Sequence, residues 1–402
     1  MSAASGTTDT HPFRLETKPL LPLYLGALIG PMGGIGIVPL LPVLAQTWAI
    51  PFSSASLAIT SYMIPFIIIQ VFSGSLAQVF NVRKTLFLGF ILYALGGIFC
   101  GLSPGLWSLL GSRVIQGLGA GFLTPVLMAQ IGELVPEKHL GKAIGFLGLF
   151  YTFGITFGPM ISGLMEVHLG WPWFFYFLAA LAGVTGLLYG WSSRGELPPS
   201  AAQDREGFWA VLPILRQALA QPGVLFLSAS AFFLFIAFIG IMTFTAHHLR
   251  SSLFLSSDRI GLLLSSTGFS GILVSPIAGY LGDRLGRVRV FRAGTVIAFI
   301  CVALMAWFPY TYLTYLLLFL AFGTGTAMAW TTLNTLAVQL SPSLRKPVTS
   351  VYNAVKFSGY ALSPVVLALI YGPFQLRGVQ LGCLAAILIS SLLTLKSRPS
   401  LS

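Results

Sequence analysis

The segment GYLGDRLGRVR, residues 279–289, follows a long apolar stretch and ends in a cluster of basic residues. A related segment, GSLAQVFNVRK, residues 74–84, follows another apolar stretch 205 residues earlier. The same offset of 205 residues separates Pro159 from Pro364, and each of these prolines lies inside an apolar stretch. Two independent pairs of landmarks that share one offset indicate that the back half of the chain repeats the front half.

The composition places this repeated chain in a membrane. Of its 402 residues, 56% are hydrophobic and only 8% are charged, and the mean hydropathy is +0.88. Soluble domains carry about one quarter charged residues, so a water-soluble enzyme is excluded, and a disordered chain is excluded by the same values. The apolar runs are long and unbroken, whereas an outer-membrane barrel needs short alternating ones. We therefore expect an all-α integral membrane protein.

The apolar runs also predict the organisation of the chain. A spanning helix needs about 20 apolar residues. Twelve segments meet this requirement, near residues 20–46, 54–79, 85–103, 106–134, 143–165, 172–192, 224–246, 260–282, 290–308, 312–340, 350–371 and 379–395. They predict two pseudo-symmetric six-helix bundles, residues 20–192 and 224–395, joined by a polar linker, 193–223, with tails at 1–19 and 396–402. Parallel repeats of six helices are the architecture of two-halved secondary transporters.

The basic residues predict the orientation in the membrane. Of the 22 Lys and Arg residues, 17 fall on the side of the N-terminus and three on the opposite side, while Arg113 and Lys356 fall inside apolar segments. The positive-inside rule then places both termini and the linker in the cytoplasm. The net charge of +12 is therefore a topology signal, and we expect a multi-pass protein of the inner (plasma) membrane with no nucleic-acid partner.

Four motifs resemble signature sequences of the major facilitator superfamily, in particular its drug:proton antiporter branch. Residues 279–289 resemble the family's G-x-L-x-D-R-x-G-R loop, and residues 113–121 resemble its R-x-x-Q-G-x-G-A-G pattern. Residues 154–163 resemble the G-x-x-x-G-P-x-x-G-G antiporter motif with Ser162 in place of one Gly, and residues 170–174 resemble G-W-R-W with Pro172 in place of the Arg. The resemblance implies a twelve-helix transporter that works by alternating access. It implies no cofactor or metal, and it makes a proton gradient a candidate energy source.

The resemblance further implies a cytoplasmic gating latch in the two repeated loops, and the alternative is that their charged residues are solvated topology markers. We expect Gly279 to allow close packing and Gly286 to take a left-handed turn. In the front copy Gln78 replaces the acid, and Asn81 replaces the turn glycine, which Asn can do because it tolerates the left-handed region. The candidate latch residues are Gly74, Gln78, Arg83, Lys84, Gly279, Asp283, Arg284, Gly286 and Arg287.

Small residues in the fifth apolar segment predict a close helix contact. They recur every three to five positions and so form a flat face on which one neighbouring helix can approach, and a proline inside the helix bends it. The residues are Gly154, Gly158, Pro159, Ser162 and Gly163. The resemblance implies that this motif marks exporters. The alternative is ordinary packing with no bearing on direction.

Arg113 lies about a third of the way into the fourth apolar segment. An ionised side chain there costs about 3 kcal/mol or more unless it faces protein or water, so it should face the bundle interior. Gln116, Gly117 and Gly121 lie at helical spacing from it, which predicts a contact with the first helix. Arg113 is then either a structural anchor or a coupling residue.

No acidic residue lies in the middle of an apolar segment, which disfavours recognition of a cationic drug by a carboxylate inside the membrane. Polar and aromatic side chains in these segments are instead the candidates for a substrate cavity. They are Tyr62, Gln70, Arg113, Gln116, Gln130, Trp330, Thr331, Asn334, Tyr352, Asn353 and Lys356. Lys356 either snorkels to the inner interface or makes the cavity positive, and in the second case it favours anionic ligands and could release a proton during the cycle.

Together these features predict a secondary exporter of small amphipathic or drug-like molecules, working as a monomer on a small-molecule substrate in the bilayer. The alternatives are an importer or exchanger of organic anions and a flippase for lipid or lipid-linked substrates. An enzyme is not expected, because no H-E-x-x-H, G-x-S-x-G or Walker pattern occurs.

Overall fold

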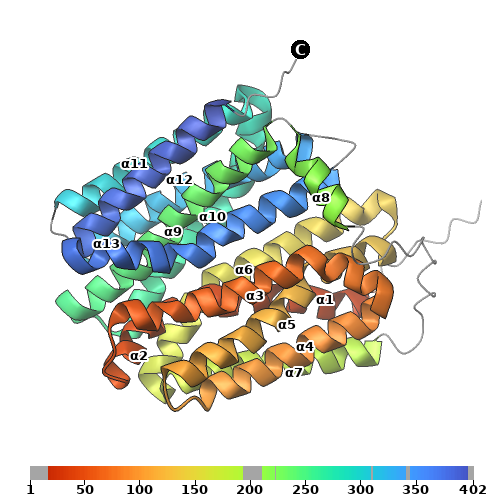
Figure 1. The fold of residues 1–402 in the computed structure, drawn as a ribbon, viewed down its shortest axis with the longest axis horizontal. Helices are drawn as coiled ribbons and strands as arrows, with labels where there is room; N and C mark the ends of the chain where they lie inside the picture. The colour runs from red at the N-terminus through yellow and green to blue at the C-terminus, as the bar shows by residue number, and fades with distance from the viewer. Residues whose placement is uncertain (1–16, 193–210, 222, 309–310, 341–344, 397–402) are drawn as a thin grey trace, which may run out of the picture.

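The computed structural model describes residues 17–192, 211–221, 223–308, 311–340 and 345–396. The regular structure in these ranges is helical throughout (Figure 1). Most of the predicted linker and of the two predicted tails lies outside the described residues.

The front half forms the first bundle. Its helices are α1 (Thr17–Ile35), η1 (Val38–Leu40), α2 (Leu41–Thr47), α3 (Phe52–Phe80), α4 (Val82–Gly101), α5 (Leu106–Leu134), α6 (Glu137–Leu169) and α7 (Pro172–Ser192). The first three together make one membrane span, Leu20–Thr47. This span is interrupted because Pro39 and Pro42 lack the N–H that would continue a regular helix.

The back half forms the second bundle. Its helices are α8 (Val211–Leu219), a short helix of the linker, followed by α9 (Val224–Ser252), α10 (Ser257–Leu285), α11 (Arg287–Trp307), α12 (Tyr312–Gln339) and α13 (Arg345–Lys396). The described ranges hold 11 candidate spans, and the last of them, Pro347–Lys396, has 50 residues. A span needs only about 20 residues, and the non-helical backbone of Gln375 (φ 52°, ψ −156°) divides α13 into two arms. The twelve-helix prediction is therefore confirmed.

The two bundles repeat each other in register. The helices α3 and α10 each have 29 residues and begin 205 residues apart, and α4 and α11 also begin 205 residues apart. The junctions match as well, because Asn81 (φ 73°, ψ 129°) and Gly286 (φ 91°, ψ 132°) share one backbone conformation. Glycine adopts this conformation freely, and Asn81 stabilises it by accepting a hydrogen bond from the N–H of Arg83 at 2.9 Å. The predicted repeat and the predicted role of Asn81 are confirmed.

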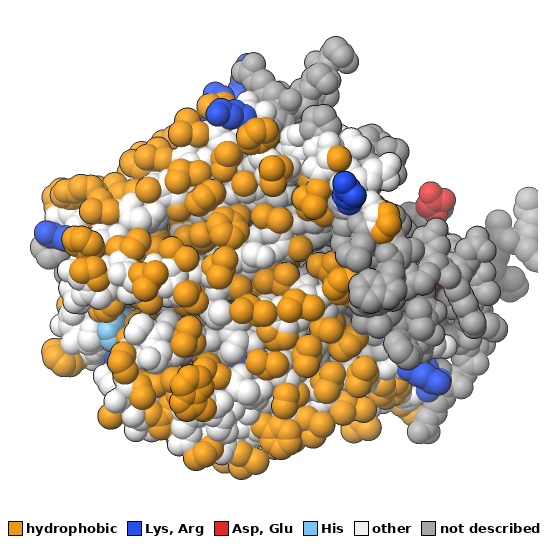
Figure 2. All heavy atoms as spheres, viewed as in Figure 1, with side chains coloured by type: hydrophobic (Ala, Val, Ile, Leu, Met, Phe, Trp, Pro, Cys, Tyr) orange, Lys and Arg blue, Asp and Glu red, His pale blue; other side chains and the backbone are white. Residues whose placement is uncertain are grey.

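The surface is that of a multi-pass membrane protein. Hydrophobic side chains cover the visible face, and the few Lys and Arg side chains lie near its edges (Figure 2). Large apolar side chains such as Trp107, Leu187 and Leu369 are mostly exposed, as expected for residues that face lipid. We call the end that carries Thr17, α8 and Lys396 the linker end. The end that carries Phe52 and Ser257 is the opposite end.

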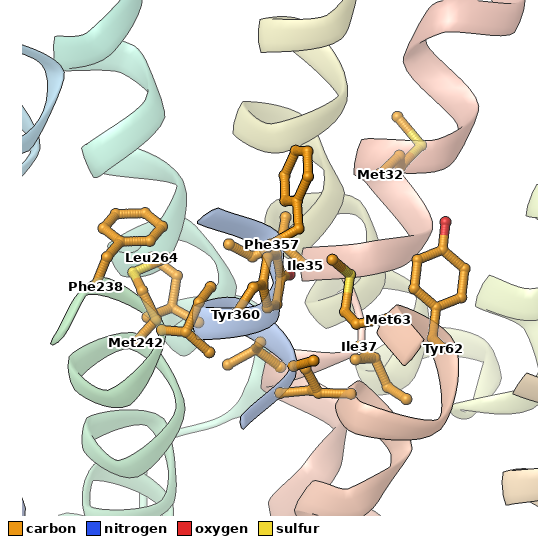
Figure 3. Packing of buried hydrophobic residues seen from close by; sticks show 14 of the residues in the cluster. Met32, Ile35, Ile37, Tyr62, Met63, Phe238, Met242, Leu264, Phe357 and Tyr360 are labelled. Atoms are coloured by element: carbon orange, nitrogen blue, oxygen red, sulfur yellow. The ribbon is translucent and has the colours of Figure 1, made fainter. Parts of the chain in front are cut away.

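The buried apolar core continues from one bundle into the other. Figure 3 shows Phe357 and Tyr360 of α13 between residues of the first bundle, such as Met63, and residues of α9, such as Phe238 and Met242. All five belong to one cluster of buried side chains. The bundles therefore share a packed interface, and the candidate site lies in this interface.

Candidate functional site

A cavity of about 250 Å³ lies between the two bundles. Four helices of the first bundle (α1, α3, α5 and α6) and four of the second (α9, α10, α12 and α13) contribute to its wall. The lining residues are Gly30, Pro31, Gly34, Ile35, Tyr62, Met63, Phe66, Thr124, Tyr151, Thr152, Ile155, Phe235, Phe238, Thr267, Gly268, Gly271, Ser275, Trp330, Thr331, Asn334, Lys356, Phe357 and Tyr360. Because each bundle supplies half of the wall, a relative movement of the bundles would open or close the cavity.

The lining residues follow the repeat. Seven residues of the first bundle have a lining partner 205 positions later: Gly30 and Phe235, Tyr62 and Thr267, Met63 and Gly268, Phe66 and Gly271, Tyr151 and Lys356, Thr152 and Phe357, and Ile155 and Tyr360. The cavity is therefore centred on the pseudo-symmetry axis between the bundles. The offset is also the signal that could have located Tyr151 and Thr267, which were not among the predicted cavity residues.

The predicted cavity residues separate into two groups. Tyr62, Trp330, Thr331, Asn334 and Lys356 line the cavity. The other predicted residues are not among the lining residues: Gln70, Arg113, Gln116, Gln130, Tyr352 and Asn353. Tyr352, for example, is buried within the second bundle in a cluster with Phe291 and Leu333. The side-chain amide of Gln130 is buried in α5 and has no hydrogen-bond partner among the described residues.

Lys356 is the charged residue of the cavity wall. It is 8% exposed, and its Nζ donates a hydrogen bond to Oδ1 of Asn353 at 2.7 Å. The same Nζ lies 4.6 Å from the ring centroid of Phe357 and 5.1 Å from that of Tyr352. Aromatic faces attract a cation at such distances. The ion pairs found in the described ranges do not include Lys356.

Arg113 supports the wall from behind. Its side chain is fully buried, as predicted, and donates hydrogen bonds to the carbonyl oxygens of Ala58 and Gly33, both at 3.1 Å, and to Oε1 of Gln116 at 2.6 Å. Its guanidinium lies 4.1 Å from the ring centroid of Tyr62, which lines the cavity. The side chain thus ties α5 to α1 and α3, which favours the anchor interpretation over a direct contact with substrate.

The glycines that follow Arg113 pack against a different helix from the one predicted. A Cβ on Gly117 would meet the carbonyl oxygen of Tyr62, and a Cβ on Gly121 would meet that of Phe66. Both contacts are with α3, whereas the first helix had been expected. The face of α5 that carries Gly117 and Gly121 lies against α3, whereas the long side chain of Arg113 reaches Gly33 of α1.

The small residues of α6 serve two neighbours instead of the single one predicted. Gly154 and Gly158 pack against Leu28 and Met32 of α1, within the first bundle. Gly163 packs against the backbone of Ser257 of α10, in the second bundle. Since 3.6 residues make one turn, positions 154 and 163 lie on different faces of the helix. The motif therefore contributes both to the interior of one bundle and to the interface between the two.

The interface is closed at the opposite end. The ring of Phe52 stacks on that of His247 with the centroids 4.0 Å apart, and it also contacts Phe244 at 5.6 Å. Further along the interface, the hydroxyl of Thr60 donates a hydrogen bond to the carbonyl of Ala361 at 2.7 Å. Each of these contacts joins the first bundle to the second.

The interface is open towards the linker end. Gly148 and Gly145 of α6 continue the stripe of Thr152, and Gly279 of α10 continues the stripe of Ser275, both of which line the cavity. A Cβ on any of these three glycines would meet no described atom within 4 Å. The expectation that Gly279 packs closely is therefore wrong for this conformation, because no described atom lies close enough to contact a side chain there.

The predicted latch residues lie at the linker end. Asp283 is 68% exposed and pairs with Arg287 of its own loop, with Nη2 and Oδ1 2.7 Å apart. Arg284 lies over the ring of Tyr280, while Arg83 approaches the carbonyl of Gly190 at 3.5 Å and Lys84 is exposed. Gly74 and Gln78 belong to the part of α3 whose side chains the structure does not describe.

Comparison with known proteins assigns the family. The model of the Major Facilitator Superfamily matches residues 23–364, and a second match covers residues 242–400. The chain belongs to the Major Facilitator Superfamily. As in other members of this superfamily, its function is transport across a membrane, and it is not an enzyme.

Relatives within the superfamily span most of the chain. The uncharacterized MFS-type transporter YwfA of Bacillus subtilis is 23% identical over 93% of this chain and 90% of its own. The lincomycin resistance protein LmrB of the same organism is 25% identical over 72% of this chain and 70% of its own. The crystal structure of a bacterial homolog of the human lysosomal transporter Spinster, inward-facing and unoccupied, covers 96% of this chain with a TM-score of 0.74 and 17% identity. This likeness shows a common fold.

Proposed function

We propose that this Major Facilitator Superfamily transporter is a secondary exporter of small amphipathic molecules, and that it works as a monomer by alternating access. The observation that carries the proposal is the cavity at the bundle interface, since one chain supplies both halves of its wall. The contacts at Phe52 and Thr60 hold one end closed, while the stripes of Gly148 and Gly279 are open at the other. Secondary transporters place their substrate sites at such repeat interfaces.

The direction rests on two further observations. The antiporter motif of α6 contributes to the moving interface through Gly163, and a relative over most of the chain is a drug-resistance protein. We place the linker end in the cytoplasm because 17 of the 22 basic residues fall on that side. In this orientation the structure is open to the cytoplasm, as an exporter must be to load its substrate.

Cysteine labelling tests the orientation. The three native cysteines are buried, so they contribute little background. In intact cells, an impermeant thiol reagent should label an exposed cysteine introduced at Ser252 and should not label one introduced at Gln217 of α8. Labelling of Gln217→Cys but not of Ser252→Cys would reverse the proposed orientation.

Transport in everted vesicles tests the function. Vesicles that contain the protein should accumulate a substrate from a panel that includes lincomycin, and a protonophore should abolish accumulation if a proton gradient drives it. In the native protein the side chain of Thr60 in the first bundle contacts the carbonyl of Ala361 in the second. A short thiol crosslinker between Thr60→Cys and Ala361→Cys can therefore lock the two bundles together. The crosslink should stop transport and reduction should restore it, with each single-cysteine variant as a control. Unchanged transport after complete crosslinking would contradict alternating access.

A further inference from the structure

We propose that the cavity selects small aromatic anions, and that the ammonium group of Lys356 binds their carboxylate. The inference deepens the proposed function, because it names the substrate class of the same cavity. It depends on binding alone, so it can be tested separately from the direction and the driving force of transport.

The charge of the cavity wall is one-sided. Lys356 is the only Lys, Arg, Asp, Glu or His among the 23 lining residues. A buried charge without a counter-charge is costly, and this cost falls when an anionic ligand enters. A cation has the reverse effect, because it would bring a second positive charge beside the first. The wall therefore discriminates by the sign of the ligand's charge.

The ammonium group has donors left for a ligand. An ammonium has three N–H groups, and Asn353 accepts one of them. The aromatic faces around Nζ stabilise the positive charge without accepting a full hydrogen bond. The remaining N–H groups can donate to the two oxygens of a carboxylate, which forms the stronger, charge-assisted kind of bond.

A second unpartnered donor lies one turn further along the same helix. The hydroxyl of Tyr360 is buried, belongs to a lining residue and has no hydrogen-bond partner among the described residues. Lys356 and Tyr360 are four positions apart, so their side chains lie on one face of α13. A buried hydroxyl without a partner is costly, and a ligand oxygen between the two residues would satisfy it.

The rest of the wall suits an aromatic body. Phe66, Phe235, Phe238 and Trp330 line the cavity, and rings from both bundles can pack on a flat ligand. The volume of about 250 Å³ lies just below the usual range for small-molecule sites, about 300–1,000 Å³. A ligand with one or two fused rings and a short acidic group fits this description.

The snorkelling alternative makes a different prediction. A snorkelling lysine extends its amine to the membrane interface and to water. Here Nζ of Lys356 donates a hydrogen bond to Asn353, about one turn away on the same helix, and the side chain of Lys356 stays buried. Lys142, on the linker-end part of α6, is by contrast exposed and provides a matched lysine outside the cavity.

Binding of three matched probes tests the inference. Purified full-length protein in nanodiscs is titrated calorimetrically with 2-naphthoate, neutral 2-naphthamide and cationic 2-naphthylmethylammonium. We expect naphthoate to bind at least about tenfold more tightly than naphthamide, because the ammonium of Lys356 pairs with a full negative charge in naphthoate but only with a neutral carbonyl in naphthamide. The ammonium probe should bind most weakly.

Variants assign this preference to Lys356. Lys356→Gln should abolish the preference of naphthoate over naphthamide. Lys356→Arg should retain this preference, and Lys142→Gln should not change it. If Lys356→Gln fails to fold, the retention in Lys356→Arg and the probe ratio in the native protein still decide. Equal affinities for naphthoate and naphthamide, binding of none of the probes, or a full preference in folded Lys356→Gln would each overturn the inference. A failure of transport with the binding preference intact would contradict only the proposed function.

Discussion

An alanine at Gly163 should shift the transporter towards a state that is open at the opposite end. In this structure a Cβ at Gly163 would meet the backbone carbonyl of Ser257 in the other bundle. Backbone atoms cannot move aside as a flexible side chain can, so the bundles must separate slightly. The proposed alternating access would separate the bundles at the opposite end and relieve this clash, so the substitution should destabilise the closed state selectively.

The expected magnitude follows from the cost of overpacking. Extra methyl groups in packed interiors cost about 1–3 kcal/mol. A difference of this size between two states changes their ratio by about 5–150-fold. The higher helix propensity of alanine, about 1 kcal/mol, is present in both states and cancels. If the native transporter is mainly closed at the opposite end, the Gly163→Ala variant should therefore populate the state that is open at that end to a readily measured extent.

The populations can be measured by the distance between two spin labels. Cysteines at Leu169 of α6 and Ser252 of α9 lie on exposed positions of the two bundles at the opposite end. Gly163→Ala should increase the population with the longer inter-label distance. Gly183→Ala is the matched control, since a Cβ there meets no described atom within 4 Å.

A second control separates switching from stability. Gly154 contacts Leu28 of α1 inside the first bundle, so Gly154→Ala should lower the melting temperature without changing the distance distribution. An unchanged distribution in Gly163→Ala, or an equal shift in Gly163→Ala and Gly154→Ala, would refute the role of the α6–α10 contact as the element that switches.

Three further substitutions test the anchor, the turn and the latch. Arg113→Gln should destabilise the fold by about 3 kcal/mol or more, because it removes hydrogen bonds to two buried carbonyls. The control Arg216→Gln, at an exposed position, should change the stability by less than about 0.5 kcal/mol. Thermal unfolding in nanodiscs measures both changes. Gly286→Ala should cost about 1–2 kcal/mol from its positive φ, while Asn81→Gly at the equivalent junction should cost less; equal losses would contradict the backbone argument. Asp283→Asn should cost less than about 1 kcal/mol, since its ion pair is exposed, and yet should lower transport by shifting the gate; an unchanged transport rate would exclude a latch role.

Much of the fold could be predicted from the sequence because the membrane imposes a strong pattern. Apolar segments long enough to span a membrane can be counted directly, and the segment at residues 350–371 was separated from that at 379–395 even though the helix runs on as α13. The repeat supplied a second constraint. With the offset of 205 residues, the first residue of α3 corresponds to the first residue of α10. The same offset pairs Asn81 with Gly286, and so it predicted the positive φ of Asn81.

The cavity was predicted only in part, because polarity does not tell which way a side chain points in a bundle. Gln116 and Gln130 are polar and buried, yet they are not among the lining residues. Phe235 and Phe238 line the cavity, but a phenylalanine in an apolar helix is equally consistent with core packing or with a lipid contact. The direction of each helix face depends on how helices pack across bundles, and helical spacing within one segment does not contain this information.

The repeat also shows where the two halves differ chemically. Positions 151 and 356 are equivalent, and both line the cavity, but one is a neutral tyrosine and the other a lysine. A symmetric wall would hold a ligand equally from both sides, whereas this wall places its charge on the second bundle alone. An anionic ligand would therefore remain attached to the second bundle through Lys356 while its apolar body slides against the first. Such an attachment lets the bundles rock around a bound ligand without first breaking its strongest contact, which is a physical reason for one half of a repeated transporter to keep the charge.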